Sequence, residues 1–199
     1  MTSPVDYLMG LSRRLGLDPP EQLILGAAEI LGQRLFAPPS VKGWEGGLAW
    51  MTTANMMNRA NLAGVLMGQV DLDVLATDAE YGAPPDMAET EGRNPFFAGP
   101  VLAVQIIQES GWTPEYSLVQ KLQKMGADGD ARTVEYLAED LLAIEPPAET
   151  LAGLVAHFAE LRAEEGVPED GLAATPDRME RALRRLAHVI LSLPEAQLN

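Results

Sequence analysis

Prolines and glycines divide this chain into segments whose apolar residues recur every three or four positions, and that helical period most restricts how it can fold. The clearest segment is residues 175–193, where one face of a helix would carry Met179, Leu183, Leu186 and Ile190. No segment alternates apolar and polar residues for long, as a half-buried strand would. We therefore expect an all-α protein, a globular bundle of several helices.

Capping residues place several helix ends. Ser3 is expected to cap a first helix that begins at Pro4 and that Gly16 closes. Thr113, with Pro114 in the first turn, is expected to open a later helix in the same way. Both predictions rest on local chemistry, because a cap satisfies backbone groups that the helix itself leaves without a partner.

The segment from Thr52 to about Gly68 is expected to form a central helix. Thr52, with Asn55 three residues on, resembles a weak capping box. Apolar residues fall on both sides of this helix, so most of its circumference should be buried. Asn55 and Arg59 would then lie near a buried end and would need polar partners.

Residues 77–100 hold four prolines and no helical period, which predicts a long Pro-rich surface loop or an insertion. At 199 residues the chain is long enough to bury a core. We expect a single α-helical domain over residues 1–199, either complete or as a fragment of a larger protein.

Charge and composition narrow the possible partners. The chain is acidic, with 29 Asp and Glu against 14 Lys and Arg and a formal charge of −15, so a phosphate backbone would be repelled. Nucleic acid is therefore not expected as a partner. No apolar run approaches the ~18 residues that a membrane span needs. The first residues lack a signal-peptide pattern, which leaves the compartment unknown.

Catalytic and metal-binding motifs are few. The chain has no cysteine, and His157 and His188 lie on different predicted helices without a zinc-binding pattern. Residues 128–139 resemble a calcium loop but carry Thr133 where the loop requires glycine. Asp130 is better interpreted as a helix N-cap. We predict no catalytic residue, no metal site and no cofactor.

The most unusual segment is PPSVKGWEGGLAW at residues 38–50, which we call the Trp/Gly turn. Its glycines can adopt backbone angles that other residues resist, and its prolines stiffen the start. Two interpretations remain open: an architectural turn plugged onto the helices by its tryptophans, or a ligand- or partner-binding surface. The candidate binding residues in and after this turn are Lys42, Trp44, Trp50, Asn55 and Arg59.

The last predicted helix carries a second candidate surface. Arg178, Arg181 and Arg185 form a basic stripe opposite its apolar face. This stripe is either an exposed face paired with neighbouring carboxylates, or a docking surface for an acidic partner such as a second copy. Residue types and spacing do not separate these interpretations.

The segment LGQRLFAPPSVKGWEGGLAW, followed by NRANL, resembles the most distinctive stretch of the domain of unknown function 1800 family. The matching residues are Gly32, Gln33, Pro38, Pro39, Lys42, Gly43, Trp44, Gly46, Gly47, Trp50 and Arg59. The opening SPVDYLMGLSRRLGL and the ending VILSLPEAQLN are similar to the family as well. The resemblance implies a mostly helical and often exported parent protein, longer at its amino terminus, with a protein partner and no settled activity.

These observations favour a non-enzymatic binding or assembly module whose contact surface includes the Trp/Gly turn. Its partner would be another protein or a second copy of the chain. The alternative is a hydrolase or transferase with an anion-recognising pocket built on Lys42, Asn55 and Arg59. Neither a substrate nor a particular partner can be named from the residues.

Overall fold

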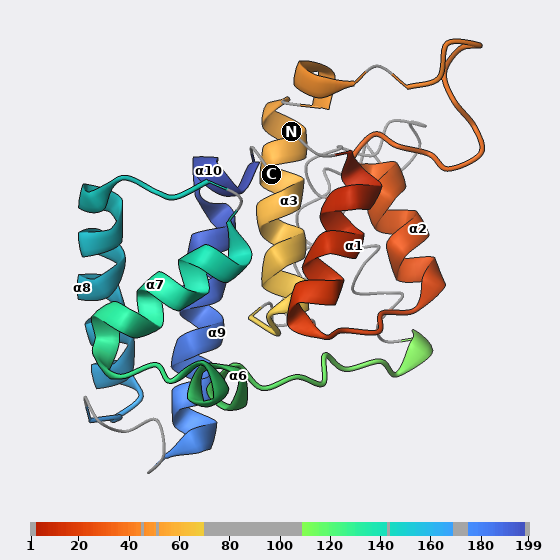
Figure 1. The fold of residues 1–199 in the computed structure, drawn as a ribbon. Coiled ribbons are helices and arrows are strands. Elements are labelled where there is room, and N and C mark those ends of the chain that lie inside the picture. The colour runs from red at the N-terminus through yellow and green to blue at the C-terminus, as the bar shows by residue number, and fades with distance from the viewer. Residues whose placement is uncertain are drawn as a thin grey trace, which may run out of the picture. The chain divides into compact units, whose positions relative to one another are not determined.

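The computed structural model describes residues 3–69 apart from 45 and 51, residues 109–168 apart from 143, and residues 175–197 (Figure 1). In these residues the regular elements are helices, beside one isolated bridge between Ser40 and Gly43, which confirms the all-α prediction. The chain divides into two compact units, Met1–Pro114 and Glu115–Asn199. We expect one domain over residues 1–199. Whether the two units form one domain depends on how they join, so this expectation stays a prediction. The loop predicted at 77–100 lies outside the described residues.

The first unit contains α1 (Pro4–Leu15), α2 (Glu21–Ile30), the short 3₁₀ helix η1 (Gly47–Trp50) and α3 (Thr53–Leu66). The predicted ends of α1 are confirmed. Ser3 Oγ accepts a hydrogen bond of 3.1 Å from the backbone N–H of Asp6, and Gly16 ends the helix with a left-handed φ of +69°. A core forms where α2 contacts both α1 and α3.

Helix α3 begins as its capping signal predicts. Thr52 Oγ1 accepts a hydrogen bond of 3.1 Å from the backbone N–H of Asn55. Every residue from Leu62 to Met67 is buried, which confirms burial around the whole circumference for the second half of this helix. Small residues such as Ala63, which is 0% exposed, allow this close packing.

The second unit contains α6 (Leu118–Met125), α7 (Gly129–Leu141), α8 (Ala148–Glu164), α9 (Pro176–Ser192) and the short α10 (Pro194–Gln197). Helix α9 is its centre, because it contacts the other four. The apolar face predicted for this helix is confirmed, with exposures of at most 1% at Met179, Leu183, Leu186 and Ile190.

The predicted start of α6 at Thr113 is wrong. The helix begins at Leu118, with Ser117 as its N-cap. The carboxylate of Glu180, on α9, accepts hydrogen bonds of 3.0 Å from the backbone N–H groups of Leu118 and Val119 and from Ser117 Oγ. A carboxylate 61 to 63 residues away therefore satisfies this helix end, which no local signal could indicate.

The N-cap assigned to Asp130 is also wrong. Asp128 occupies the N-cap position of α7, and Asp130 lies in the first turn. Its carboxylate pairs with Arg162, whose side chain is 7% exposed and also donates to the carbonyl of Val167 at 3.2 Å. A buried arginine needs such partners, so Asp130 supports tertiary packing between α7 and α8.

Candidate functional site

The chain leaves α2 through a glycine that fixes its direction. Gly32 has a left-handed φ of +89°, and its N–H donates to the carbonyl of Glu29 at 2.9 Å. The side-chain oxygen of Gln33 accepts a hydrogen bond of 3.1 Å from the backbone N–H of Val5, at the start of α1. The segment that leads from α2 into the Trp/Gly turn is thus anchored on both α1 and α2.

The end of the Trp/Gly turn is anchored at the start of α3. Asn55 Nδ2 donates to the carbonyl of Trp50 at 3.3 Å. A Cβ atom built on Gly32 would lie 3.7 Å from Asn55 Nδ2 and 3.9 Å from Trp50 Cδ1, which are ordinary contacts. Two predicted site residues, Trp50 and Asn55, therefore meet at the base of the turn, beside the end of α2.

Between these two anchors the chain projects away from the helices, and we call residues 36–43 the tip loop (Figure 1). The loop is closed by a tight turn in which the N–H of Gly43 donates to the carbonyl of Ser40 at 3.0 Å. The N–H of Lys42 donates to Ser40 Oγ at 3.2 Å, and Gly43 has a φ of +88°. Val41 and Lys42 therefore occupy the two central positions of a β-turn.

The tip loop presents apolar side chains to solvent. Phe36 and Val41 have relative exposures of 95% and 106%, and all residues from 36 to 42 are exposed. Phe36 also adopts a φ of +63°, which is costly for a bulky residue. Burying each of these side chains would contribute roughly 1.5–3 kcal/mol.

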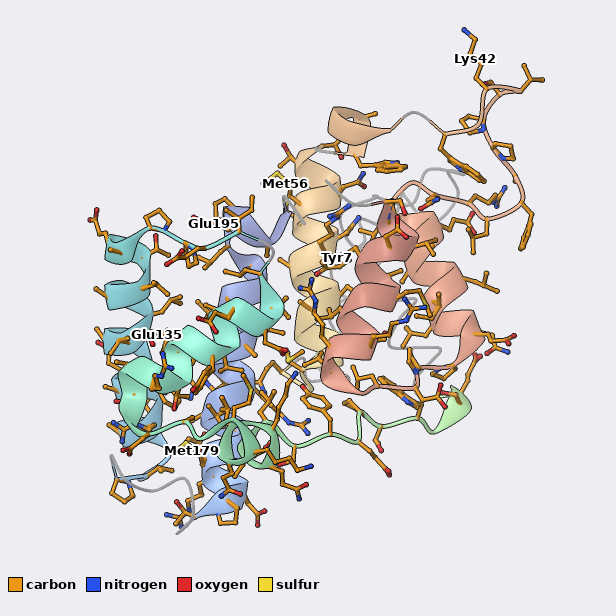
Figure 2. All side chains as sticks on the ribbon, in the orientation of Figure 1. Tyr7, Lys42, Met56, Glu135, Met179 and Glu195 are labelled. Carbon is orange, nitrogen blue, oxygen red and sulfur yellow. The ribbon has the colours of Figure 1, made fainter. Side chains whose placement is uncertain are left out.

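The other candidates of the Trp/Gly turn lie apart. Figure 2 shows the Lys42 side chain at the outer end of the tip loop, directed away from the helices. Lys42 is exposed and makes no ion pair with the residues that the structure describes. Trp44, two residues on, is half-buried.

Arg59 is an interior residue. It is 1% exposed, and its guanidinium lies over the ring of Tyr7, 4.9 Å from the ring centroid. Tyr7 comes from α1 and lies between α1 and α3, where its hydroxyl donates to the carbonyl of Arg59 at 3.5 Å (Figure 2). Burial raises the pKa of Tyr7 to about 12 against the opposing charge of Arg59, and burial also lowers the pKa of Arg59.

The structure therefore does not bring Lys42 to Arg59. Lys42 stands at the outer end of an exposed loop, whereas the arginine is enclosed beneath Tyr7. Asn55 lies one turn before Arg59 on α3, as expected, but its amide is directed to the carbonyl of Trp50.

The basic stripe of α9 is engaged within its own unit. Arg181 donates to Glu165 at 2.8 Å, and Arg185 donates to Glu164 at 2.8 Å, both at the end of α8. Arg178 is exposed beside them. A docking role for this stripe stays a prediction, and two of its three charges already have carboxylate partners.

Sequence reasoning missed Phe36 and Val41 as surface residues. An apolar residue in a loop is ordinarily expected to contact the core. Nothing in the sequence at Phe36 or Val41 indicates that the side chain is exposed instead. The available signal was the turn, because Pro39 before it and Gly43 at its last position place Val41 in its centre.

Metal ligands do not gather in the described residues, where no group of three His, Asp or Glu side chains could hold an ion. Within the same residues no helix is long and apolar enough to cross a bilayer. The candidate site is a loop with an anchored base and an exposed apolar tip.

The family described as "Protein of unknown function (DUF1800)" matches residues 1–198, and the chain belongs to this family. The family assignment predicted from the sequence is thereby confirmed. No curated protein and no solved structure matches the chain. The family description states no activity.

Proposed function

We propose that this chain is a non-enzymatic binding or assembly module and that the tip loop, with the Trp/Gly turn behind it, is its contact surface. The carrying observation is the exposure of Phe36 and Val41, at 95% and 106%, on one projecting loop. Single exposed apolar residues are common on protein surfaces. Two on one short loop, beside Pro38 and Pro39, form an apolar feature of the kind that marks interaction sites.

The loop is held in shape before any partner arrives. Its base is fixed by the Gln33–Val5 and Asn55–Trp50 hydrogen bonds, and its end is closed by the Ser40–Gly43 turn. A loop that is already ordered loses less conformational entropy on binding, so more of the contact energy contributes to affinity. This preorganisation supports a binding role.

Lys42 adds a charge to the apolar tip. An exposed ion pair contributes only ~0–1 kcal/mol, whereas buried apolar area contributes more. We therefore assign affinity to Phe36 and Val41, and orientation on the partner to Lys42. The proposed partner surface combines an apolar contact with a carboxylate.

The alternative, an anion pocket of a hydrolase or transferase, is less well supported. It requires Lys42, Asn55 and Arg59 to reach one ligand. Lys42 extends outward, while Arg59 is 1% exposed beneath Tyr7. A ligand held by the outer lysine would not reach the buried guanidinium.

The experiment replaces Val41 with a photo-crosslinking amino acid, identifies the protein that it labels, and measures binding of the purified pair by calorimetry. We expect Val41→Asp and Trp44→Ala to weaken this binding at least about tenfold, the effect of losing a well-packed anchor. The far-ultraviolet circular dichroism should stay that of the wild type, because positions 41 and 44 both lie outside the helices.

Met57→Asp is the matched control. Met57 is an exposed apolar residue, at 47%, that lies on α3 outside the tip loop, so its replacement should leave affinity unchanged. The proposal fails if Val41→Asp binds as tightly as Met57→Asp. It also fails if Trp44→Ala unfolds the helices, because the turn would then be part of the core.

A further inference from the structure

We infer that the occupant of the tip loop is a second copy of this chain, with each loop docked on the exposed face of the partner's α2. This inference rests on the proposed function, since it takes the same loop as the contact surface. It adds the identity of the partner, the surface that receives the loop and the symmetry of the assembly.

Charge points to a second copy. Several cations of the described residues pair within the chain, such as Arg34 with Glu29 at 2.6 Å and Lys121 with Asp140. Lys42 projects beyond the helices and makes no ion pair there. A chain with 29 acidic and 14 basic residues offers carboxylates over its surface, so a second copy supplies what Lys42 lacks.

Helix α2 has a face that matches the tip. Glu21, Leu25 and Glu29 are four residues apart, so they share one side of the helix, and all three are exposed. Leu25 is 46% exposed, an apolar side chain between two carboxylates. We call these three residues the α2 outer face.

The two surfaces are complementary in kind. The tip loop places Val41 next to Lys42, and the α2 outer face places Leu25 four residues from Glu21. Glu29 already holds Arg34, whereas Glu21 makes no ion pair with other described residues. The pairing is therefore Val41 on Leu25 and Lys42 on Glu21.

Symmetry doubles the contact. The tip loop and the α2 outer face both belong to the first unit, so two copies related by a two-fold axis can exchange loops and make each contact twice. Repulsion between two acidic chains is screened beyond about 8 Å at physiological ionic strength. The attraction within the close Lys42–Glu21 pair is then screened less than the repulsion between distant like charges.

The test is sedimentation velocity on the full chain at physiological salt, from about 1 μM to about 300 μM, the range of weak and transient interfaces. We expect a monomer–dimer equilibrium. Leu25→Asp and Val41→Asp should each raise the dimer Kd at least about tenfold. Lys42→Glu should also weaken the dimer, and the double variant Lys42→Glu with Glu21→Lys should restore it, because every copy then carries the swapped pair.

Met57→Asp serves again as control and should dimerise like the wild type. The exposed substitutions should leave circular dichroism unchanged, and if Leu25→Asp does not fold, the charge swap alone decides. A wild type that is monomeric throughout, or a dimer unaffected by Leu25→Asp and Val41→Asp, overturns the inference. If a monomeric chain still crosslinks from position 41 to another protein, only the second-copy inference falls. If it crosslinks to nothing, the proposed function falls too.

Discussion

At the scale of single residues, Tyr7 shows how burial changes chemistry inside the first unit. Tyr7 is 4% exposed, its ring packs against the guanidinium of Arg59, and burial raises its pKa from 10.0 to about 12. The folded state therefore favours the neutral phenol. This contribution to stability is fully present below pH 10, the unfolded pKa, and is lost as the pH rises through 12.

We expect the free energy of unfolding to fall by up to about 2–3 kcal/mol between about pH 10 and about pH 12 on account of Tyr7. Tyr7→Phe should reduce this fall, as measured by urea unfolding across that range. Burial also raises the pKa of Tyr116 in the second unit. Tyr116→Phe should therefore remove a separate part of the fall in the free energy of unfolding at high pH. An unchanged pH dependence in Tyr7→Phe would contradict the buried placement of its hydroxyl.

At the scale of elements, Glu180 ties α9 to the start of α6. Its carboxylate accepts from two backbone N–H groups and from Ser117, and it also receives Arg184 Nε at 3.0 Å. We expect Glu180→Ala to destabilise the protein by about 1–3 kcal/mol, because these donors lose their acceptor. Hydrogen exchange should show the loss at the amides of Leu118 and Val119.

Two variants make this prediction specific. Glu180→Gln keeps one acceptor oxygen and should recover part of the stability. Glu160→Ala removes a carboxylate that is 74% exposed on α8, and it should change stability by less than about 0.5 kcal/mol. If the first amides of α6 stay protected in Glu180→Ala, Ser117 alone fixes the start of this helix.

At the scale of the whole molecule, the tip loop is expected to be an early site of cleavage. Trypsin cuts after lysine and arginine. Among the lysines, Lys42 lies at the centre of an exposed turn, whereas Lys121 and Lys124 lie within α6. Limited digestion should therefore cut the Lys42–Gly43 bond before the bonds inside α6, as mass spectrometry of the fragments would show.

The rate of this cleavage at different protein concentrations also tests whether the tip loop binds a second copy. If the tip loop docks on a partner, the Lys42–Gly43 bond should be cut more slowly at high protein concentration than at low concentration, relative to the bonds in α6. Val41→Asp should be cut at the same relative rate at both concentrations. Slow cleavage of this bond in the dilute monomer would contradict the exposed turn.

Much of the helical architecture could be predicted from the sequence because its signals are local. Ser3 and Gly16 bound α1, and the spacing of Met179, Leu183 and Ile190 defines the buried face of α9. Caps act over three residues and helical faces over three or four, so neighbours along the chain carry this information. The family resemblance also rested on one short segment around Trp44.

The arrangement of the candidate site was decided by the tertiary structure. Asp130 pairs with Arg162, 32 residues away, and Glu180 accepts from the backbone N–H of Leu118, where α6 begins. Lys42 and Arg59 are 17 positions apart in the sequence, yet one lies at an exposed turn and the other under Tyr7. Local chemistry determines which residues form a helix or a turn. Packing between distant elements determines which side chains are enclosed and which remain available to a partner.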